Sequence, residues 1–339
     1  MKFLRELFHQ ELDADGEIEI VGETFLRRDI LRQLAPNPYQ IAFAEWKQAR
    51  ENALFEKAEI ILARYDNRAR FDQLRATFGA GAMIPFVGAG MSAPSGFPLW
   101  TRFLVDLAKE SHVEPTSIEQ FLQQGKFEEA AQSLHDDLGS GLFNENVEMT
   151  FSKLCEIDGP LNYLPTLFSG GSVMTTNFDT LLERVYTHQD NNGFDRVISG
   201  AAMSEVLRQM ASGSRLLIKM HGDCRQVADR VLLKVEYDKL YGDNDLVEQF
   251  FNGVIFRQSI LFVGCSLLND RTVSTMKSIV RRYGAARVPR HYAFLELKAS
   301  DDRVTRKKHL AEANIFPIWY PEREHDESLE ALFLKMLET

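Results

Sequence analysis

Short apolar runs alternate with longer amphipathic stretches along most of the chain. From Ala82 onward, six such runs predict buried strands, and helical patterns lie between them. The runs are AMIPFVGAG (82–90), GSVMTTN (171–177), RLLIKMHGD (215–223), ILFVGCSL (260–267), HYAFLEL (291–297) and IFPIWY (315–320). Strands that are apolar on both faces and alternate with helices indicate a parallel sheet covered by helices on both sides. We therefore expect an α/β, Rossmann-like fold.

Helical periodicity marks the segments around these runs. Residues 1 to about 80 are expected to form an N-terminal helical extension, in which Glu45–Arg64 has apolar residues recurring at three and four positions. A helical insertion is expected at about 100–170, with Gly139–Gly141 as an internal turn. Later helices are expected at 178–188, 245–258, 271–284, 302–314 and 328–338. The chain thus divides into an extension, 1–80, and an α/β domain, 81–339, that carries a small helical subdomain.

Composition narrows the class of protein. Among 339 residues, Lys and Arg number 39 and Asp and Glu 49, for a net charge of −10, which disfavours generic binding of nucleic acid or anionic lipid. Cys155, Cys224 and Cys265 form neither a disulfide framework nor a CxxC zinc pair, which indicates a reducing compartment. The longest apolar stretch, at 260–268, is far shorter than the ~20 residues of a membrane span, and the start lacks a signal-peptide pattern. We expect a cytoplasmic protein without a membrane partner.

One basic stretch stands out against the acidic average. Lys277–Arg290 carries five positive charges and no acidic residue. Such a run is typical of a solvated helix face, and it is also compatible with a docking surface for an acidic partner or nucleic acid. The sequence leaves both interpretations open.

Four of the predicted strands end in glycine or polar residues, at Gly88, Asn177, His221 and Gly264. In parallel sheets, ligands bind beyond the carboxyl ends of the strands. Gly88 begins GAGMSA, which fits the G-x-G-x-x-G/A pattern that brings backbone N–H groups to a pyrophosphate, although a simple tight turn explains it as well. A hydride-transfer enzyme of the Rossmann type also needs a second strand that ends in an acidic residue ~20 residues further on. Asp106 is near that distance but lies in a helical pattern, which argues against such an enzyme.

The second and third strand ends offer catalytic side chains. In TTNFD (175–179), Asn177 could cap the next helix, with Asp179 in its first turn, but capping explains only one polar residue. His221 follows the third strand, where Gly222 lets the backbone turn away and expose the imidazole to a cleft. A lone histidine is more often structural, yet its pKa of ~6.5 suits a general base.

The fourth strand end is the FVGCSL segment. Its glycine and serine, Gly264 and Ser266, are expected either to form a core strand and turn or to contact a phosphate or ribose. The segment is not a GxSxG nucleophile elbow, because no glycine follows at the required spacing.

Taken together, GAGMS, TTNFD, KMHGD and FVGCSL resemble, in order and approximate spacing, the SIR2 (sirtuin-like) NAD-binding domain. The resemblance covers Met83 to about Tyr320 and is closer to the bacterial SIR2-like NAD-hydrolysing effectors of anti-phage defence than to protein deacylases. Deacylases usually carry a zinc module of two CxxC pairs, which three scattered cysteines cannot form. No metal is therefore expected.

The resemblance implies roles for individual residues. NAD would be the substrate; Asn177 would orient the nicotinamide ribose or the attacking water, Asp179 would hold the carboxamide, and His221 would be the general base. The implied NAD-binding residues are Gly88, Ala89, Gly90, Ser92, Thr176, Gly264 and Ser266.

The resemblance also implies a function, a regulated NAD+ glycohydrolase that releases nicotinamide and ADP-ribose in abortive infection. Control would come from residues 1–80, from a homo-oligomer, or from a sensor in trans such as a DNA-translocating ATPase or a short Argonaute. The alternatives are an NAD-dependent deacylase and a non-catalytic module that senses NAD or ADP-ribose. The sequence leaves open the trigger and whether the product is linear or cyclic.

Overall fold

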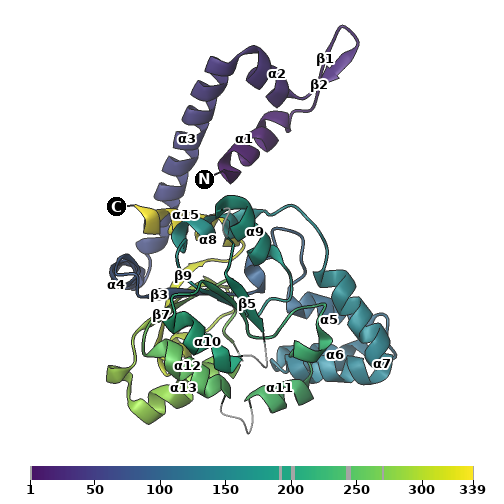
Figure 1. Ribbon diagram of the computed structural model, residues 1–339, viewed down its shortest axis with the longest axis vertical. Helices are drawn as coiled ribbons and strands as arrows, with labels where there is room; N and C mark the ends of the chain where they lie inside the picture. Colours follow the sequence, from purple (N-terminus) through teal and green to yellow (C-terminus); the bar gives the residue numbers. More distant parts are fainter. Residues whose placement is uncertain (1, 191–192, 200–202, 242–245, 269–270, 339) are drawn as a thin grey trace.

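A seven-stranded parallel sheet forms the centre of the protein (Figure 1). The computed structural model describes residues 2–190, 193–199, 203–241, 246–268 and 271–338. The strand order is β5-β6-β4-β3-β7-β8-β9. The strands are β3 Met83–Val87, β4 Val173–Thr175, β5 Arg196–Ser199, β6 Leu216–Lys219, β7 Ser259–Val263, β8 His291–Leu297 and β9 Ile315–Pro321. The predicted α/β, Rossmann-like fold is confirmed.

Neighbouring residues of each strand point to opposite faces of the sheet, and each face has its own apolar core. On one face, Val87 and Leu261 pack against helices α4, α5, α7, α9 and α15, whereas Phe86 and Phe262 pack on the other face against α10, α12, α13 and α14. Both faces are covered, so the strands are buried on both sides, as their continuous apolar runs predict. The helix bounds are α4 Asn67–Gly79, α5 Trp100–Ala108, α6 Pro115–Gln123, α7 Phe127–Phe151, α8 Leu164–Leu167, α9 Leu181–Asp190, α10 Met203–Ala211, α11 Lys234–Tyr241, α12 Leu246–Ile255, α13 Arg271–Tyr283, α14 Arg303–Ala311 and α15 His325–Leu337.

The insertion between β3 and β4 is helical, as expected. It contains α5, α6 and α7, and Gly139, with φ +76°, interrupts α7 at the predicted turn. A single-turn 3-10 helix, Gly159–Tyr163, and the short α8 then lead into β4. Within the α/β core, the sequence pattern did not predict the edge strand β5 or the helices α10 and α11.

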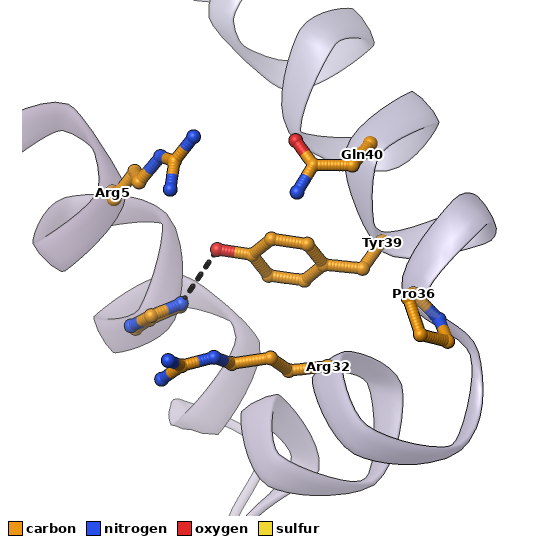
Figure 2. Close-up of a pocket in the computed structure, with 6 residues that line it drawn as sticks. Arg5, Arg32, Pro36, Tyr39 and Gln40 are labelled. Carbon is orange, nitrogen blue, oxygen red and sulfur yellow. Dashed lines mark hydrogen bonds between the residues drawn. The ribbon is translucent and has the colours of Figure 1, made fainter.

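The N-terminal residues project from the α/β core as an arm (Figure 1). The arm contains α1 Phe3–Asp13, a hairpin of β1 Ile18–Ile20 and β2 Glu23–Phe25, α2 Arg27–Leu34, and the first half of α3 Pro36–Leu62. The helices are predicted, and the hairpin is not. His9 on α1 and Tyr39 on α3 share a hydrogen bond of 2.9 Å that ties the two helices together (Figure 2).

The end of this N-terminal region belongs to the core. In α3, Arg50 forms an ion pair of 2.5 Å with Glu330 on α15. The Asn67 side chain, at the start of α4, donates to the Trp319 carbonyl and accepts from the Trp319 N–H, both on strand β9. Within the described ranges, no helix is long and apolar enough to cross a membrane.

Candidate functional site

The four predicted motifs meet at one edge of the sheet. They follow strands β6, β4, β3 and β7, which are neighbours in the sheet, and all of these strands run in parallel. Asn177 after β4 reaches the turn after β3, where its side-chain Nδ2 donates to the Gly88 carbonyl at 3.1 Å. Gly264 after β7 contacts the same turn. The polar residues therefore converge at the carboxyl edge, where α/β sheets bind ligands.

The glycines allow two loops to approach closely. A Cβ at Gly88 would lie 2.5 Å from the Gly264 carbonyl oxygen, and Gly264 has φ +68°, a conformation that favours glycine. The N–H groups of Gly88 and Gly90 donate to the carbonyls of Val263 and Gly264, each at 2.9 Å. These two N–H groups therefore already have protein acceptors, so the tight-turn interpretation explains both glycines. Half-buried Ala89 lies between them.

Asn177 is held from three sides and keeps one free acceptor. Its N–H donates to the Thr175 hydroxyl, and its Nδ2 donates to the Gly88 carbonyl and to Ser92 Oγ. A carbonyl oxygen only accepts, so the contact with Gly88 fixes which end of the amide is nitrogen. The opposite atom, Oδ1, is buried and has no hydrogen-bond partner among the described residues. A buried acceptor without a partner is costly, which is typical of an atom that a ligand or water completes.

Asp179 and Ser92 connect this amide to helix α9. Ser92 Oγ donates to Asp179 Oδ2 at 2.8 Å, and the Leu181 N–H donates to Asp179 Oδ1 at 3.0 Å. Asp179 therefore caps α9, and the alternative that Asn177 caps it is wrong. Burial raises the pKa of Asp179. Thr176, between the buried residues of this motif, is half-buried.

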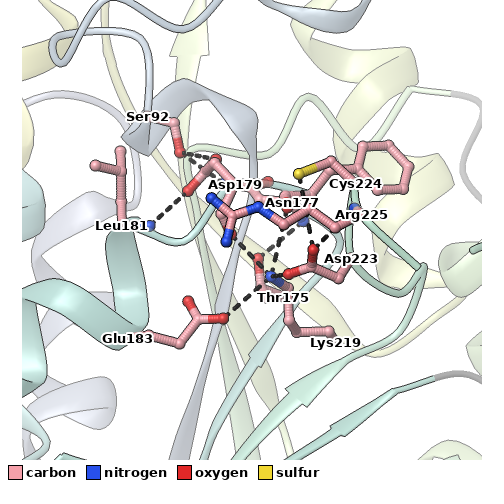
Figure 3. Close-up of polar contacts among 11 residues, drawn as sticks. Ser92, Thr175, Asn177, Asp179, Leu181, Glu183, Lys219, Asp223, Cys224 and Arg225 are labelled. Carbon is pink, nitrogen blue, oxygen red and sulfur yellow. Dashed lines mark hydrogen bonds and ion pairs between the residues drawn. The ribbon is translucent and has the colours of Figure 1, made fainter. Parts of the chain in front are cut away.

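A buried lysine organises the next layer of the site (Figure 3). Lys219, at the end of β6, is 1% exposed, and its Nζ contacts Asp223 at 2.8 Å, Glu183 at 3.1 Å and the Asp179 carbonyl at 2.8 Å. Burial alone lowers the pKa of Lys219, but Glu183 and Asp223 raise it above its usual value. Burial raises the pKa of Glu183, whereas Lys219 outweighs burial and lowers that of Asp223. Our sequence interpretation did not assign this lysine a role; a charge inside the apolar run LLIKM is the signal that could have revealed it.

His221 lies between two tyrosines of α11. Its Nδ1 and Nε2 share hydrogen bonds of 3.2 Å with the hydroxyls of Tyr237 and Tyr241. The imidazole is half-buried, and burial lowers its pKa to about 3. Gly222, with φ +78°, makes the predicted turn, but the ring is enclosed by the tyrosines and not simply exposed to a cleft, as we expected. At neutral pH the ring is uncharged and keeps one nitrogen lone pair.

Arg271 connects Tyr237 and Tyr241 to the helical insertion. Its guanidinium lies 5.4 Å from the Tyr237 ring centre and 5.9 Å from that of Tyr241. The same group forms two hydrogen bonds to Glu128 on α7, one of them 2.7 Å long, and an ion pair of 2.8 Å with Asp238 on α11. The insertion is thus connected to His221 by aromatic and charged contacts that the sequence pattern did not reveal.

The remaining predicted residues have simpler surroundings. Ser266 is exposed, and its carbonyl accepts from Arg306 at 3.2 Å. In the basic stretch, Lys277 pairs with Glu312 and Arg282 with Glu248, so part of its charge is already neutralised. In the part of the chain that the structure describes, no group of three or more His, Cys, Asp or Glu side chains is placed to hold a metal ion.

Fold and site together define a Rossmann-like α/β protein with a polar site at the carboxyl edge of its sheet. Residues 171–318 match the family model for the SIR2-like domain. This match covers less than half of the chain and confirms the resemblance to the SIR2-like family that the motifs indicate. The match begins after the Gly88 turn and includes the motifs of Asn177, His221 and Gly264.

Curated relatives are similar over about two thirds of the chain. "NAD(+) hydrolase ThsA" of Cytobacillus dafuensis is 26% identical over 209 residues, which cover 62% of this chain and 40% of that protein. "Defense-associated sirtuin 2" of Bacillus subtilis is 26% identical over 215 residues, 60% of this chain and 19% of that protein. ThsA of Bacillus cereus (strain MSX-D12) is 24% identical over 235 residues, 66% of this chain and 47% of that protein. The chain spans less than half the length of these relatives.

Proposed function

We propose that this protein hydrolyses NAD+ to nicotinamide and ADP-ribose. The observation that carries the proposal is the free Oδ1 of buried Asn177, beside the Gly88 turn at the carboxyl edge of the sheet. An acceptor in this position suits a ribose hydroxyl or a water molecule. The names of two relatives, both NAD(+) hydrolases, support the same activity.

The chemistry needs few groups. The bond between ribose C1′ and the pyridinium nitrogen breaks, and nicotinamide leaves as a neutral molecule with the bonding electrons. The ribose passes through an oxocarbenium-like state, water attacks C1′, and the proton of that water moves to a base. His221 is the proposed base, because its uncharged ring has one lone pair at neutral pH. A tyrosine hydroxyl of α11 donates to that nitrogen in this structure, so the attacking water would have to replace the hydroxyl. Attack on a cationic carbon requires only a weak base, which is consistent with a low pKa.

The other predicted residues complete the proposed NAD site. The turn of Gly88, Ala89, Gly90 and Ser92 would face the pyrophosphate, with Thr176 beside it and Gly264 and Ser266 on the adenosine side. Each carboxylate oxygen of Asp179 accepts one hydrogen bond, from Ser92 or from the Leu181 N–H, and keeps a further lone pair. We propose that Asp179 positions Ser92 and holds the nicotinamide carboxamide.

The division of the chain is also part of the proposal. Residues 81–339 would form the catalytic domain with its helical subdomain at about 100–170, and residues 1–80 would serve oligomerisation or partner contact. We propose that hydrolysis is regulated in anti-phage defence, by self-assembly or by a sensor protein in trans. The similarity to a defense-associated sirtuin of Bacillus subtilis supports this role.

Nicotinamide release by Asn177→Ala and His221→Ala tests the proposal. Loss of a positioned base typically costs ~10²–10⁴ in rate, and we expect a loss of this size for His221→Ala. Asn52→Ala, an exposed asparagine on α3, is the matched control and should keep full activity. Circular dichroism and NAD binding are measured on every variant, so that an unfolded variant is recognised.

One result would remove a residue from the site, and two others would overturn the proposed activity. Undiminished nicotinamide release by either site variant would remove that residue from the mechanism. Wild-type protein that binds NAD and leaves it intact, with and without extract of infected cells, would favour a sensing module. NAD consumption that requires an acyl-lysine peptide would show a deacylase.

A further inference from the structure

The arm contains a cavity of about 190 Å³ between α1, α2 and the first turns of α3. Its lining residues are Arg5, His9, Arg32, Pro36, Tyr39 and Gln40. Figure 2 shows Arg5 and Arg32 on either side of the Tyr39 ring, with the Gln40 amide on the same side as Arg5. Tyr39 is 4% exposed and forms the floor of the cavity, whereas both arginines are exposed at its rim.

The cavity has more positive than negative charge. In the part of the arm that the structure describes, neither Arg5 nor Arg32 forms an ion pair with a carboxylate; Arg5 only stacks on Phe43, 5.5 Å from the ring centre. Asp13 and Asp29 are the carboxylates whose charges act on His9, and Asp13 is already paired with Arg28 at 3.3 Å. Burial and then the charges of Arg28 and Arg32 lower the pKa of His9, which agrees with a positive potential.

The donors in this cavity suit one class of ligand. A guanidinium offers five N–H donors and no acceptor, and its planar fork matches two oxygens of a phosphate. His9 and Tyr39 satisfy each other, so they fix the floor and leave the two guanidiniums and the Gln40 amide to meet a ligand. Pockets that enclose a drug-sized ligand measure ~300–1,000 Å³, so 190 Å³ fits a phosphate or pyrophosphate group with the rest of its molecule outside.

We propose that this cavity binds the phosphate group of a small phosphorylated molecule, clamped between Arg5 and Arg32. The site is separate from the sheet edge and is independent of the proposed NAD hydrolysis. It gives the N-terminal region a ligand of defined chemistry.

Calorimetric titration of the full chain with inorganic phosphate and with pyrophosphate tests this site. Charge-assisted hydrogen bonds to an arginine are worth enough that Arg5→Gln and Arg32→Gln should each weaken pyrophosphate binding about 10-fold or more. Arg208→Gln, an exposed arginine of α10 whose guanidinium contacts Glu205, is the charge-matched control and should bind as the wild type does. Nicotinamide release is measured in parallel and should remain unchanged in all three variants.

Each other outcome overturns the proposal. If neither anion binds at millimolar concentration, the two arginines are only solvated side chains and the cavity is not a phosphate site. Equal binding by wild type and Arg5→Gln/Arg32→Gln would place the anion elsewhere, including the sheet edge. A single-stranded oligonucleotide that binds far more tightly than pyrophosphate and depends on both arginines would reassign the cavity to a nucleic-acid backbone.

Discussion

Replacing Lys219 by methionine tests how the site is held together. Methionine keeps a similar length and removes the charge, which leaves Glu183 and Asp223 without the cation that they contact at 3.1 and 2.8 Å. Breaking a buried ion pair by removing one partner costs ~3–5 kcal/mol, a large share of the ~5–15 kcal/mol that stabilises a typical domain. We therefore expect Lys219→Met to lose about 3–5 kcal/mol of unfolding free energy at pH 7.

The chain contains a matched control for this lysine. Lys219 and Asp223 are four residues apart, with 1% and 19% of their side chains exposed. Lys234 and Asp238 have the same spacing but are 43% and 51% exposed. Exposed pairs of this kind contribute ~0.2–1 kcal/mol, so Lys234→Met should change stability by no more than that.

Urea unfolding followed by circular dichroism measures both variants, together with Glu183→Gln and the double variant Lys219→Met/Glu183→Gln. The double variant should lose less than the sum of the single losses, because glutamine removes the charge that the missing lysine leaves buried. The loss of unfolding free energy caused by Lys219→Met should also be smaller at pH 5 than at pH 7. Without the lysine, the buried carboxylates of Glu183 and Asp223 take up protons as the pH falls and are then no longer charged. A loss below ~1 kcal/mol, or strictly additive losses, would refute this account of the network.

Two further predictions concern stability. Gly264→Ala should lower the unfolding free energy by ~1–3 kcal/mol, because φ is +68° and the added Cβ would lie 2.6 Å from the Met91 nitrogen; an unchanged melting temperature would contradict the close approach of the two loops. His291 is fully buried, its Nδ1 accepts from the Ile260 N–H, and burial lowers its pKa to about 3. Because the unfolded chain protonates this histidine below pH ~6.5 and the folded chain does not, His291 alone should contribute a loss of up to ~1.4 kcal/mol of unfolding free energy per pH unit there. His291→Asn, which retains an acceptor, should flatten this dependence in urea titrations at pH 7 and pH 5; an equally steep slope would show that His291 does not contribute.

The central strands could be predicted because a strand that is buried on both faces consists of an unbroken run of apolar residues. The edge strand β5 could not, since Arg196 and Val197 are exposed and leave no such run. The hairpin β1–β2 is exposed at five of its six residues, so neither alternation nor apolar content marks it.

Position in the sheet likewise explains which site residues were found. Gly88, Asn177 and Gly264 follow predicted strands, and parallel order alone brings them together. The partners of His221 come from Tyr237 and Tyr241, on a helix that the sequence pattern did not predict, so its enclosure could not be foreseen. These side-chain contacts join residues from separate segments of the chain, so no local sequence pattern indicates them.

Helix α3 runs without a break from the rim of the arm cavity to the flank of the sheet. At 1.5 Å per residue, its 27 residues form a rod of ~40 Å. If a helix of that length tilts by ~5° about its inner end, its outer end moves by ~3.5 Å. The inner half cannot be cut away with the arm, because Leu54, Ala58 and Ile61 pack into the body of the protein. A chain that begins at Pro36 would keep these contacts and lose those of Phe3 and Leu4 on α1, which pack in the same core. A chain that begins after Leu62 would also remove the contacts of α3 with α15.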